Sequence, residues 1–176
     1  AANHQPLTPL SFLERAARVF PERTAIVHGP QTTDYATFYA RARRLASALR
    51  RAGVRPGETV SALLLNTPPM LEAHYGVPMA GAVLNAINTR LDADAVRFIL
   101  GHGESRLVIV DSALAPMLAD VLSGMRDPDR PRVVEYTDPT EDAPAHGMGV
   151  DYEAFLEGGD PDFAWEMPAD EWDAIA

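Results

Sequence analysis

Short apolar stretches alternate with stretches of helical spacing through the middle of the chain. The apolar stretches are TVSALLL (59–65), AVLNAI (82–87) and RLVIVD (106–111). Continuous apolar runs of this length are typical of strands that helices cover on both faces. The order strand, helix, strand, helix, strand predicts an α/β domain with a mostly parallel, doubly wound sheet flanked by helices, because parallel strands need right-handed helical crossovers.

The helices between these strands have recognisable starts and ends. Thr67 and Pro68 form a cap followed by proline at the first helical position, and Asp92 is placed to cap the next helix. A third helix is expected over 112–122. Pro78 should kink or end its helix, because proline lacks a backbone N–H and crowds the preceding turn.

A further helix is expected near the start of the chain. Thr8 and Pro9 again resemble a cap followed by proline, and Phe12, Ala16 and Val19 then recur at helical spacing. The sequence therefore predicts a first helix that ends before Pro21.

Two short strands, 24–29 and 32–35, are expected to form a hairpin around Gly29 and Pro30. A helix with a clear apolar stripe is expected over 36–52. Its arginines could form a binding patch, although a solvated helix face is the favoured interpretation. They are Arg41, Arg43, Arg44, Arg50 and Arg51.

Charge and proline content divide the chain into two parts. Residues 1–125 hold 12 Arg and 10 acidic residues, whereas residues 126–176 hold 3 Arg, 15 acidic residues and six prolines. We interpret 1–125 as an α/β subdomain and 126–176 as an acidic, proline-rich surface excursion. Within it, a strand is expected at 132–136 and a short helix at 151–159, and the excursion leads to a half-strand of the same domain in DEWDAIA.

Composition excludes several function classes. The formal net charge of −10 argues against a nucleic-acid partner, because phosphate binding needs a basic surface. There is no cysteine, hence no disulfide framework, thiol nucleophile or cysteine zinc site. No apolar run approaches the length of a membrane span, and the first residues lack the features of a signal peptide. The sequence therefore predicts a soluble, cytoplasmic protein.

The expected parallel sheet invites a search for phosphate-binding glycines, and none fits. The first parallel strand ends in NTPPM, whose prolines cannot supply a row of backbone N–H groups. Gly76 and Gly81 have the spacing of P-loop glycines, but Ala82 and Val83 stand where Lys and Ser or Thr belong. Packing glycines inside a helix are the favoured interpretation.

No metal or acid–base site is evident either. His74 lies two residues after Glu72, which is not the spacing of a helical zinc pair. His102 is interpreted as a C-terminal helix residue that the dipole favours. Asp92 and Asp94 begin like a calcium loop, but the residues that follow do not continue it, so helix capping is favoured. We therefore assign no catalytic, cofactor-binding or metal-binding residue.

Three ordered stretches carry a resemblance to a known family. They are FLERAARVFPERTAIVHG, RLASALRRAGVRPGETVSALLLNTPPMLEAHYGVPMAGAVLNAINTRL and ILGHGESRLVIVD. They resemble the N-terminal region of AMP-forming acyl-CoA synthetases, the fatty-acid–CoA ligases of the adenylate-forming enzymes. The resemblance runs over 8–122 and returns at YEAFLEGGDPDF and DEWDAIA. One departure is Asp34, which precedes Tyr35 where relatives usually have threonine.

The resemblance implies an N-terminal fragment of an enzyme that converts a carboxylic acid, ATP and CoA to acyl-CoA, AMP and pyrophosphate through an acyl-adenylate. In that family, the segment resembling DEWDAIA leads into the loop that binds the ATP phosphates. We therefore expect the parent to use ATP, Mg and CoA and this segment to bind none of them. All 15 basic residues are arginine, so the two lysines that the reaction needs are absent. The fragment is predicted to be an inactive scaffold whose partner is the remainder of the synthetase chain.

Two alternatives stay open. The chain could be a short binding or regulatory module that associates through open sheet edges, which natural domains normally protect. A standalone nucleotide-binding domain is less favoured because the phosphate loop is missing. The same open edges predict self-association, and hence a homo-oligomer. The resemblance is not specific for one carboxylic acid.

Overall fold

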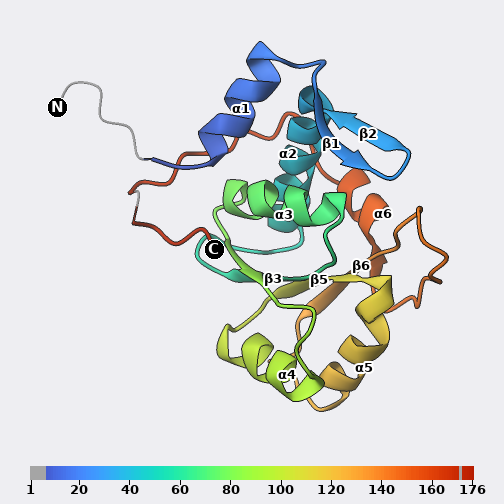
Figure 1. The fold of residues 1–176 in the computed structure, drawn as a ribbon. Coiled ribbons are helices and arrows are strands. Elements are labelled where there is room, and N and C mark those ends of the chain that lie inside the picture. Colours follow the sequence, from blue (N-terminus) through green and yellow to red (C-terminus); the bar gives the residue numbers. More distant parts are fainter. Residues whose placement is uncertain (1–6, 171) are drawn as a thin grey trace.

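The computed structural model describes residues 7–170 and 172–176 and contains two sheets (Figure 1). A five-stranded parallel sheet has the order β4-β3-β5-β6-β7, and β1 and β2 form a separate antiparallel hairpin. This arrangement confirms the predicted α/β fold. The strands are β1 (Thr24–His28), β2 (Gln31–Asp34), β3 (Thr59–Leu63), β4 (Val83–Ala86), β5 (Leu107–Asp111), β6 (Arg132–Tyr136) and β7 (Val150–Asp151).

Helices cover both faces of the parallel sheet. Figure 1 shows α4 and α5 on one face, and α2, α3 and α6 on the other. Helix α1 packs against α2 and α3. The helices are α1 (Leu10–Val19), α2 (Tyr35–Arg51), α3 (Pro68–Met79), α4 (Ala93–His102), α5 (Ala115–Ser123), which follows the short 3₁₀ helix η1 (Ser112–Leu114), and α6 (Tyr152–Glu157).

The buried apolar residues of the strands alternate between two cores. In β5, Leu107 and Ile109 belong to the core under α2 and α3, whereas Val108 and Val110 belong to the core under α4 and α5. Successive side chains of a strand point to opposite faces, so a strand covered on both sides is apolar throughout. This is why the apolar runs of the sequence are continuous.

Aspartate side chains cap the starts of several helices, among them α2 and α4. Asp92 Oδ1 accepts a 2.8 Å hydrogen bond from the backbone N–H of Ala95, which confirms the capping prediction for α4. Asp34 Oδ1 accepts a 2.7 Å hydrogen bond from the N–H of Thr37 at the start of α2. The aspartate that departs from the family pattern is therefore a good N-cap. Helix α3 ends at Met79, one residue after Pro78, as the proline predicted.

The predicted first helix is present as α1. Leu10 and Leu13 are buried, whereas Phe12 is 69% exposed and Val19 is also exposed. Phe12 and Val19, whose spacing predicted the helix, therefore do not form its buried face. Both sets of residues have helical spacing, and the contacts of α1 with α2 and α3 decide which set is buried.

The two glycines with P-loop spacing have different roles. A Cβ on Gly76 would lie 2.8 Å from the backbone oxygen of Ala42, so Gly76 allows α2 and α3 to approach closely, as predicted for a packing glycine. Gly81 lies beyond the end of α3 with φ of +75°, so its placement inside a helix was wrong. It forms a turn that disfavours residues with a side chain.

Residues 126–176 contribute to the sheet and the core. Strand β6 lies inside the sheet, and Tyr152 and Leu156 of α6 are buried, although the acid and proline content favours a surface excursion. The strand at 132–136 and the short helix were expected, but β7 was not. The division at residue 125 stays a prediction.

The last residues lie beside the edge strand β4. The backbone N–H of Leu84 donates a 3.0 Å hydrogen bond to the carbonyl of Ile175. No strand is formed over 172–176, and Glu171 of the expected DEWDAIA half-strand lies outside the described residues. The segment therefore makes one ladder-like contact without forming a strand.

Candidate functional site

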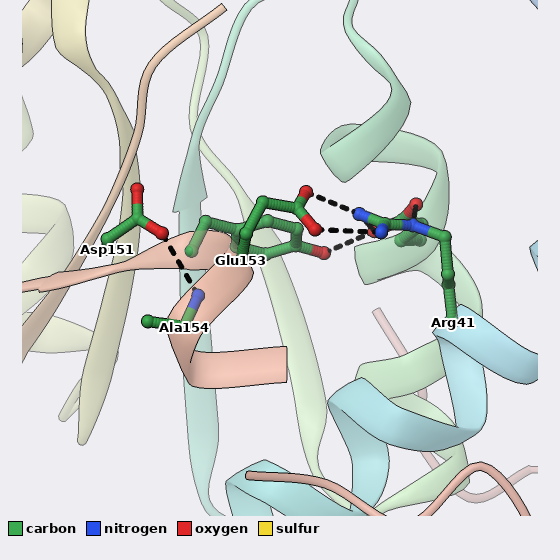
Figure 2. Close-up of polar contacts among 6 residues, drawn as sticks. Arg41, Asp151, Glu153 and Ala154 are labelled. Atoms are coloured by element: carbon green, nitrogen blue, oxygen red, sulfur yellow. Dashed lines mark hydrogen bonds and ion pairs between the residues drawn. The ribbon is translucent and has the colours of Figure 1, made fainter. Parts of the chain in front are cut away.

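A cluster of charged side chains joins α2, α3 and α6 (Figure 2). The guanidinium of Arg41 donates to Glu72 at 2.5 and 3.3 Å and to Glu153 at 2.6 and 2.8 Å. The hydroxyl of Tyr152 donates a 2.6 Å hydrogen bond to Glu72. Asp151 caps α6 by accepting a hydrogen bond from the N–H of Ala154. The cluster fixes the start of α6 against the two long helices.

The acid–base properties of this cluster suit a structural role. Glu72 is only 1% exposed, and its carboxylate is neutralised by Arg41. Burial raises the pKa of Tyr152, and the adjacent Glu72 raises it further. Burial works to lower the pKa of Arg41, but the hydrogen bonds to Glu153 and Glu72 outweigh it and raise that pKa. The raised pKa values keep Arg41 charged and the hydroxyl of Tyr152 protonated, which suits a structural role.

Two neighbouring arginines of α2 hold the segment 159–167, which we name the strap. Arg44 Nη1 donates to the carbonyl of Gly159 at 3.0 Å, and Arg43 Nε donates to that of Phe163 at 3.1 Å. Trp165 Nε1 donates to the hydroxyl of Tyr39 at 2.8 Å. The interpretation of the arginines as a solvated face is therefore wrong for Arg41, Arg43 and Arg44. Arg50 and Arg51 are exposed.

The carboxyl ends of β3 and β5 form the topological switch point of the sheet. The chain goes from β3 to β4 on one side, and the order then reverses so that β5 lies on the other side of β3. In open α/β sheets this is where ligands and functional groups gather. The residues here are Asn66 and Thr67 after β3, and Asp111 and Ser112 at and after the end of β5.

Asp111 and Ser112 are buried at this point. Asp111 Oδ1 accepts a 3.0 Å hydrogen bond from the N–H of Ala113. Asp111 Oδ2 and Ser112 Oγ have no hydrogen-bond partner within the described part of the chain. Burial raises the pKa of Asp111, the N–H of Ala113 works against that rise, and the nearby carboxylate of Asp138 adds to it.

A second polar group lies beside Asp111. His28 Nε2 lies 2.8 Å from Asp138 Oδ2, and the N–H and hydroxyl of Thr140 each donate to Asp138 Oδ1 at 2.8 Å. Burial works to raise the pKa of Asp138, but the hydrogen bonds from Thr140 and His28 outweigh it and lower that pKa. These contacts fix the β1–β2 hairpin to the loop that follows β6.

An apolar hollow of about 220 Å³ opens next to these groups. It lies between the hairpin and the start of α3, with His28 on its wall. Its lining residues are Ile26, Val27, His28, Asn66, Thr67, Pro68, Met70 and Leu71.

Two features of the described residues bear on nucleotide and metal binding. The first two residues of α3, Pro68 and Pro69, lack the backbone N–H groups with which a helix start binds phosphate. Among residues 7–170 and 172–176, no group of three His, Cys, Asp or Glu side chains is placed to hold a metal ion. The absence of catalytic, cofactor-binding and metal-binding residues stays a prediction.

The histidines singled out in the sequence are separated in the structure. His74 Nδ1 lies 2.7 Å from the carbonyl of Met70, one turn earlier in α3. His102 lies in the last turn of α4 and stacks on Phe98, with ring centroids 5.3 Å apart. The sequence search did not single out Asp111 or Asp138. Asp111 ends β5 and Asp138 lies two residues after the end of β6, so both lie at carboxyl ends of parallel strands, and this position was the signal that could have found them.

No helix in the described part of the chain is long and apolar enough to cross a membrane.

Comparison with known proteins identifies relatives over nearly the whole chain. The chain is 42% identical to the peroxisomal acetate/butyrate–CoA ligase of Arabidopsis thaliana, over 99% of this chain and 32% of that protein. It is 41% identical to an acetate–CoA ligase of Humulus lupulus, over 100% of this chain and 33% of that protein. The chain thus spans about a third of the length of the curated relatives it matches.

The fold is also similar to that of a CoA ligase of known structure. The crystal structure of an anthranilate CoA ligase in complex with anthranoyl-AMP superposes with a TM-score of 0.82 at 21% identity, covering 94% of this chain and 30% of that one. The sequence profile of the AMP-binding enzyme family matches residues 13–174. The chain therefore belongs to the AMP-binding enzyme family.

Proposed function

We propose that this chain is the N-terminal scaffold of an ATP-dependent acyl-CoA ligase. The complete enzyme would convert a carboxylic acid, ATP and CoA to acyl-CoA, AMP and pyrophosphate through an acyl-adenylate. The observation that carries the proposal is a family match over residues 13–174 in a chain that spans about a third of its CoA-ligase relatives. The sheet and its two helical layers would then form one part of a larger catalytic domain.

We also propose that the chain is inactive by itself. Acid activation concentrates negative charge around the α-phosphate, and enzymes stabilise this charge with Mg²⁺ and preorganised cationic or N–H donors. The chain contains no lysine, and prolines occupy the helix start after β3. The half-buried Arg41 is already neutralised by two carboxylates.

The acid is proposed to be a short-chain fatty acid. The names of the similar Arabidopsis and Humulus ligases specify acetate or butyrate, and both are short carboxylic acids. We further propose a cytoplasmic location, which the lack of cysteine supports. Fractionation of cells expressing the tagged full-length protein tests this location, and recovery in the peroxisomal fraction contradicts it.

Acyl-CoA formation tests the function. The 176-residue chain and the protein encoded by a coding sequence that continues past Ala176 are each incubated with ATP, Mg²⁺, CoA and acids from acetate to palmitate. Mass spectrometry of the products should show acetyl-CoA or butyryl-CoA only with the longer protein. Turnover by the 176-residue chain contradicts the scaffold role, and a longer protein without ligase activity contradicts the family function.

The contact between Leu84 and Ile175 bears on the alternative of a module that associates through open edges. It uses one N–H of the outer edge of β4 within the chain itself. This favours a role for that edge inside one polypeptide over a role in capturing a separate strand.

A further inference from the structure

The apolar hollow between β1 and α3 lies on an exposed apolar surface. On its rim, Val27 is 70% exposed and Leu71 is 44% exposed. Leu65, which follows β3 and precedes the lining residue Asn66, is also exposed. Adjacent exposed apolar residues around a concavity are typical of an interaction surface, whereas isolated ones are common on any protein.

The volume of the hollow indicates what could fill it. Sites for small molecules and cofactors usually enclose about 300 to 1,000 Å³. At about 220 Å³, the hollow lies below this range. It is therefore better suited to apolar side chains from a packed polypeptide than to a nucleotide or an acyl group with its carrier.

The walls of the hollow are held in place. His28 is fixed by Asp138, which Thr140 also contacts. On the other wall, the backbone N–H of Thr67 donates a 2.8 Å hydrogen bond to the carbonyl of Leu65. A surface fixed in this way loses little conformational entropy when a partner packs on it.

The hollow also lies beside the switch point of the sheet. Its lining residues Asn66 and Thr67 follow β3, and the buried Asp111 ends the neighbouring strand β5. In open α/β sheets the functional crevice forms outside the carboxyl ends of the strands at this point. A ligase that uses this sheet as its scaffold would therefore place other parts of its chain against this edge.

We propose that the remainder of the ligase polypeptide packs on this surface and inserts one or two apolar side chains into the hollow. This inference rests on the proposed function. The occupant is assigned because the relatives are about three times as long as this chain, so about two thirds of such an enzyme is available to cover the surface. An apolar occupant matches an apolar hollow, and burial of the rim residues stabilises the contact.

Thiol labelling of the full-length ligase tests the docking surface. The chain contains no cysteine, so Val27→Cys and Leu71→Cys each introduce one thiol within residues 1–176. Phe98→Cys on α4 is the matched control, because Phe98 is 67% exposed, nearly the same as Val27, and lies on the opposite face of the sheet. Labelling by N-ethylmaleimide is followed at each position by peptide mass spectrometry.

We expect Val27→Cys and Leu71→Cys to react at least tenfold more slowly than Phe98→Cys. Rates within twofold of each other would overturn the proposal. So would protection of Val27→Cys and Leu71→Cys that is lost on dilution, since a second copy would then be the occupant. Each rate is expressed relative to that of the folded Phe98→Cys variant under the same conditions, and ligase activity is assayed separately. Missing activity therefore contradicts the proposed function, whereas equal labelling contradicts the docking surface.

Discussion

The hydroxyl of Tyr152 donates a 2.6 Å hydrogen bond to the carboxylate of Glu72, although the two residues lie 80 positions apart in the sequence. Both side chains are buried, and the guanidinium of Arg41 neutralises the charge of the carboxylate. The acidic C-terminal third of the chain is therefore attached to the helical layer through a buried polar contact as well as through apolar packing.

Tyr152→Phe should lower the free energy of unfolding by about 1.5 to 3 kcal/mol, the usual contribution of a hydrogen bond to a charged group. The ring stays packed against Tyr136, so the loss reports on the hydroxyl. Urea denaturation monitored by circular dichroism measures the change. Glu153→Gln is the control, because Glu153 is 53% exposed and should contribute less than about 1 kcal/mol. Equal effects of the two substitutions would contradict this account.

Gly159→Ala should destabilise the chain because the strap passes too close to α2 for a side chain. The added Cβ would lie 2.0 Å from the backbone oxygen of Arg44. Overpacking against backbone costs about 1 to 3 kcal/mol. Thermal unfolding measures the effect.

Gly101→Ala is the matched control for Gly159→Ala. Gly101 lies in α4, and a Cβ there meets nothing within 4 Å. Alanine in a helix should stabilise by about 0.5 to 1 kcal/mol relative to glycine. An equal fall in melting temperature for both glycine substitutions would mean that the close approach of the strap is not the cause.

Asp34→Ala should cost about 1 kcal/mol, because the N–H of Thr37 loses its acceptor at the start of α2. Asp34→Asn keeps an oxygen at the same position and should cost only a fraction of this. The free energy of unfolding of the two variants gives the comparison. A loss for Asn as large as that for Ala would show that capping is not what Asp34 contributes.

Asp111 should make stability fall as pH rises. Burial raises the pKa of Asp111 in the folded state above its unfolded value near 3.8. Its contribution is therefore fully present below that value and is lost as pH rises through the folded pKa. Urea unfolding from pH 3 to pH 7 should show Asp111→Asn gaining stability relative to the wild type over this range.

Asp138 should show the opposite sign in the same experiment. The hydrogen bonds from Thr140 and His28 lower its folded pKa below 3.8 despite burial. Its contribution is therefore present above pH 3.8 and is lost as pH falls through the folded pKa. The free energy of unfolding of the wild type should thus rise relative to that of Asp138→Asn as pH rises through this range. The same direction of change for both aspartates would contradict the two environments described above.

The order of strands and helices could be predicted because apolar periodicity and capping residues are local signals. Asp92 marked the start of α4, and the proline at position 78 marked the end of α3. The buried face of α1 could not be predicted with the same reliability. Two apolar sets, one with Leu10 and one with Phe12, both have helical spacing, and only tertiary contacts distinguish them.

The polar clusters could not be predicted from the sequence, because their pairings also depend on tertiary contacts. Arg41 pairs with Glu72 and with Glu153, which are 31 and 112 positions away, and no local pattern encodes such a pairing. Judged by local sequence alone, the arginines of α2 were therefore interpreted as a solvated helix face. Composition was also misleading for the C-terminal third, where scattered apolar residues such as Tyr152 enter the core between acidic ones.

The proposed scaffold should be unable to activate a carboxylic acid without the rest of a ligase. Acid-dependent exchange of labelled pyrophosphate into ATP measures the first half-reaction directly. With acetate or butyrate present, the account predicts exchange by the protein that continues past Ala176 and only background exchange by the 176-residue chain. Exchange by the purified 176-residue chain that saturates with both ATP and the acid would contradict it.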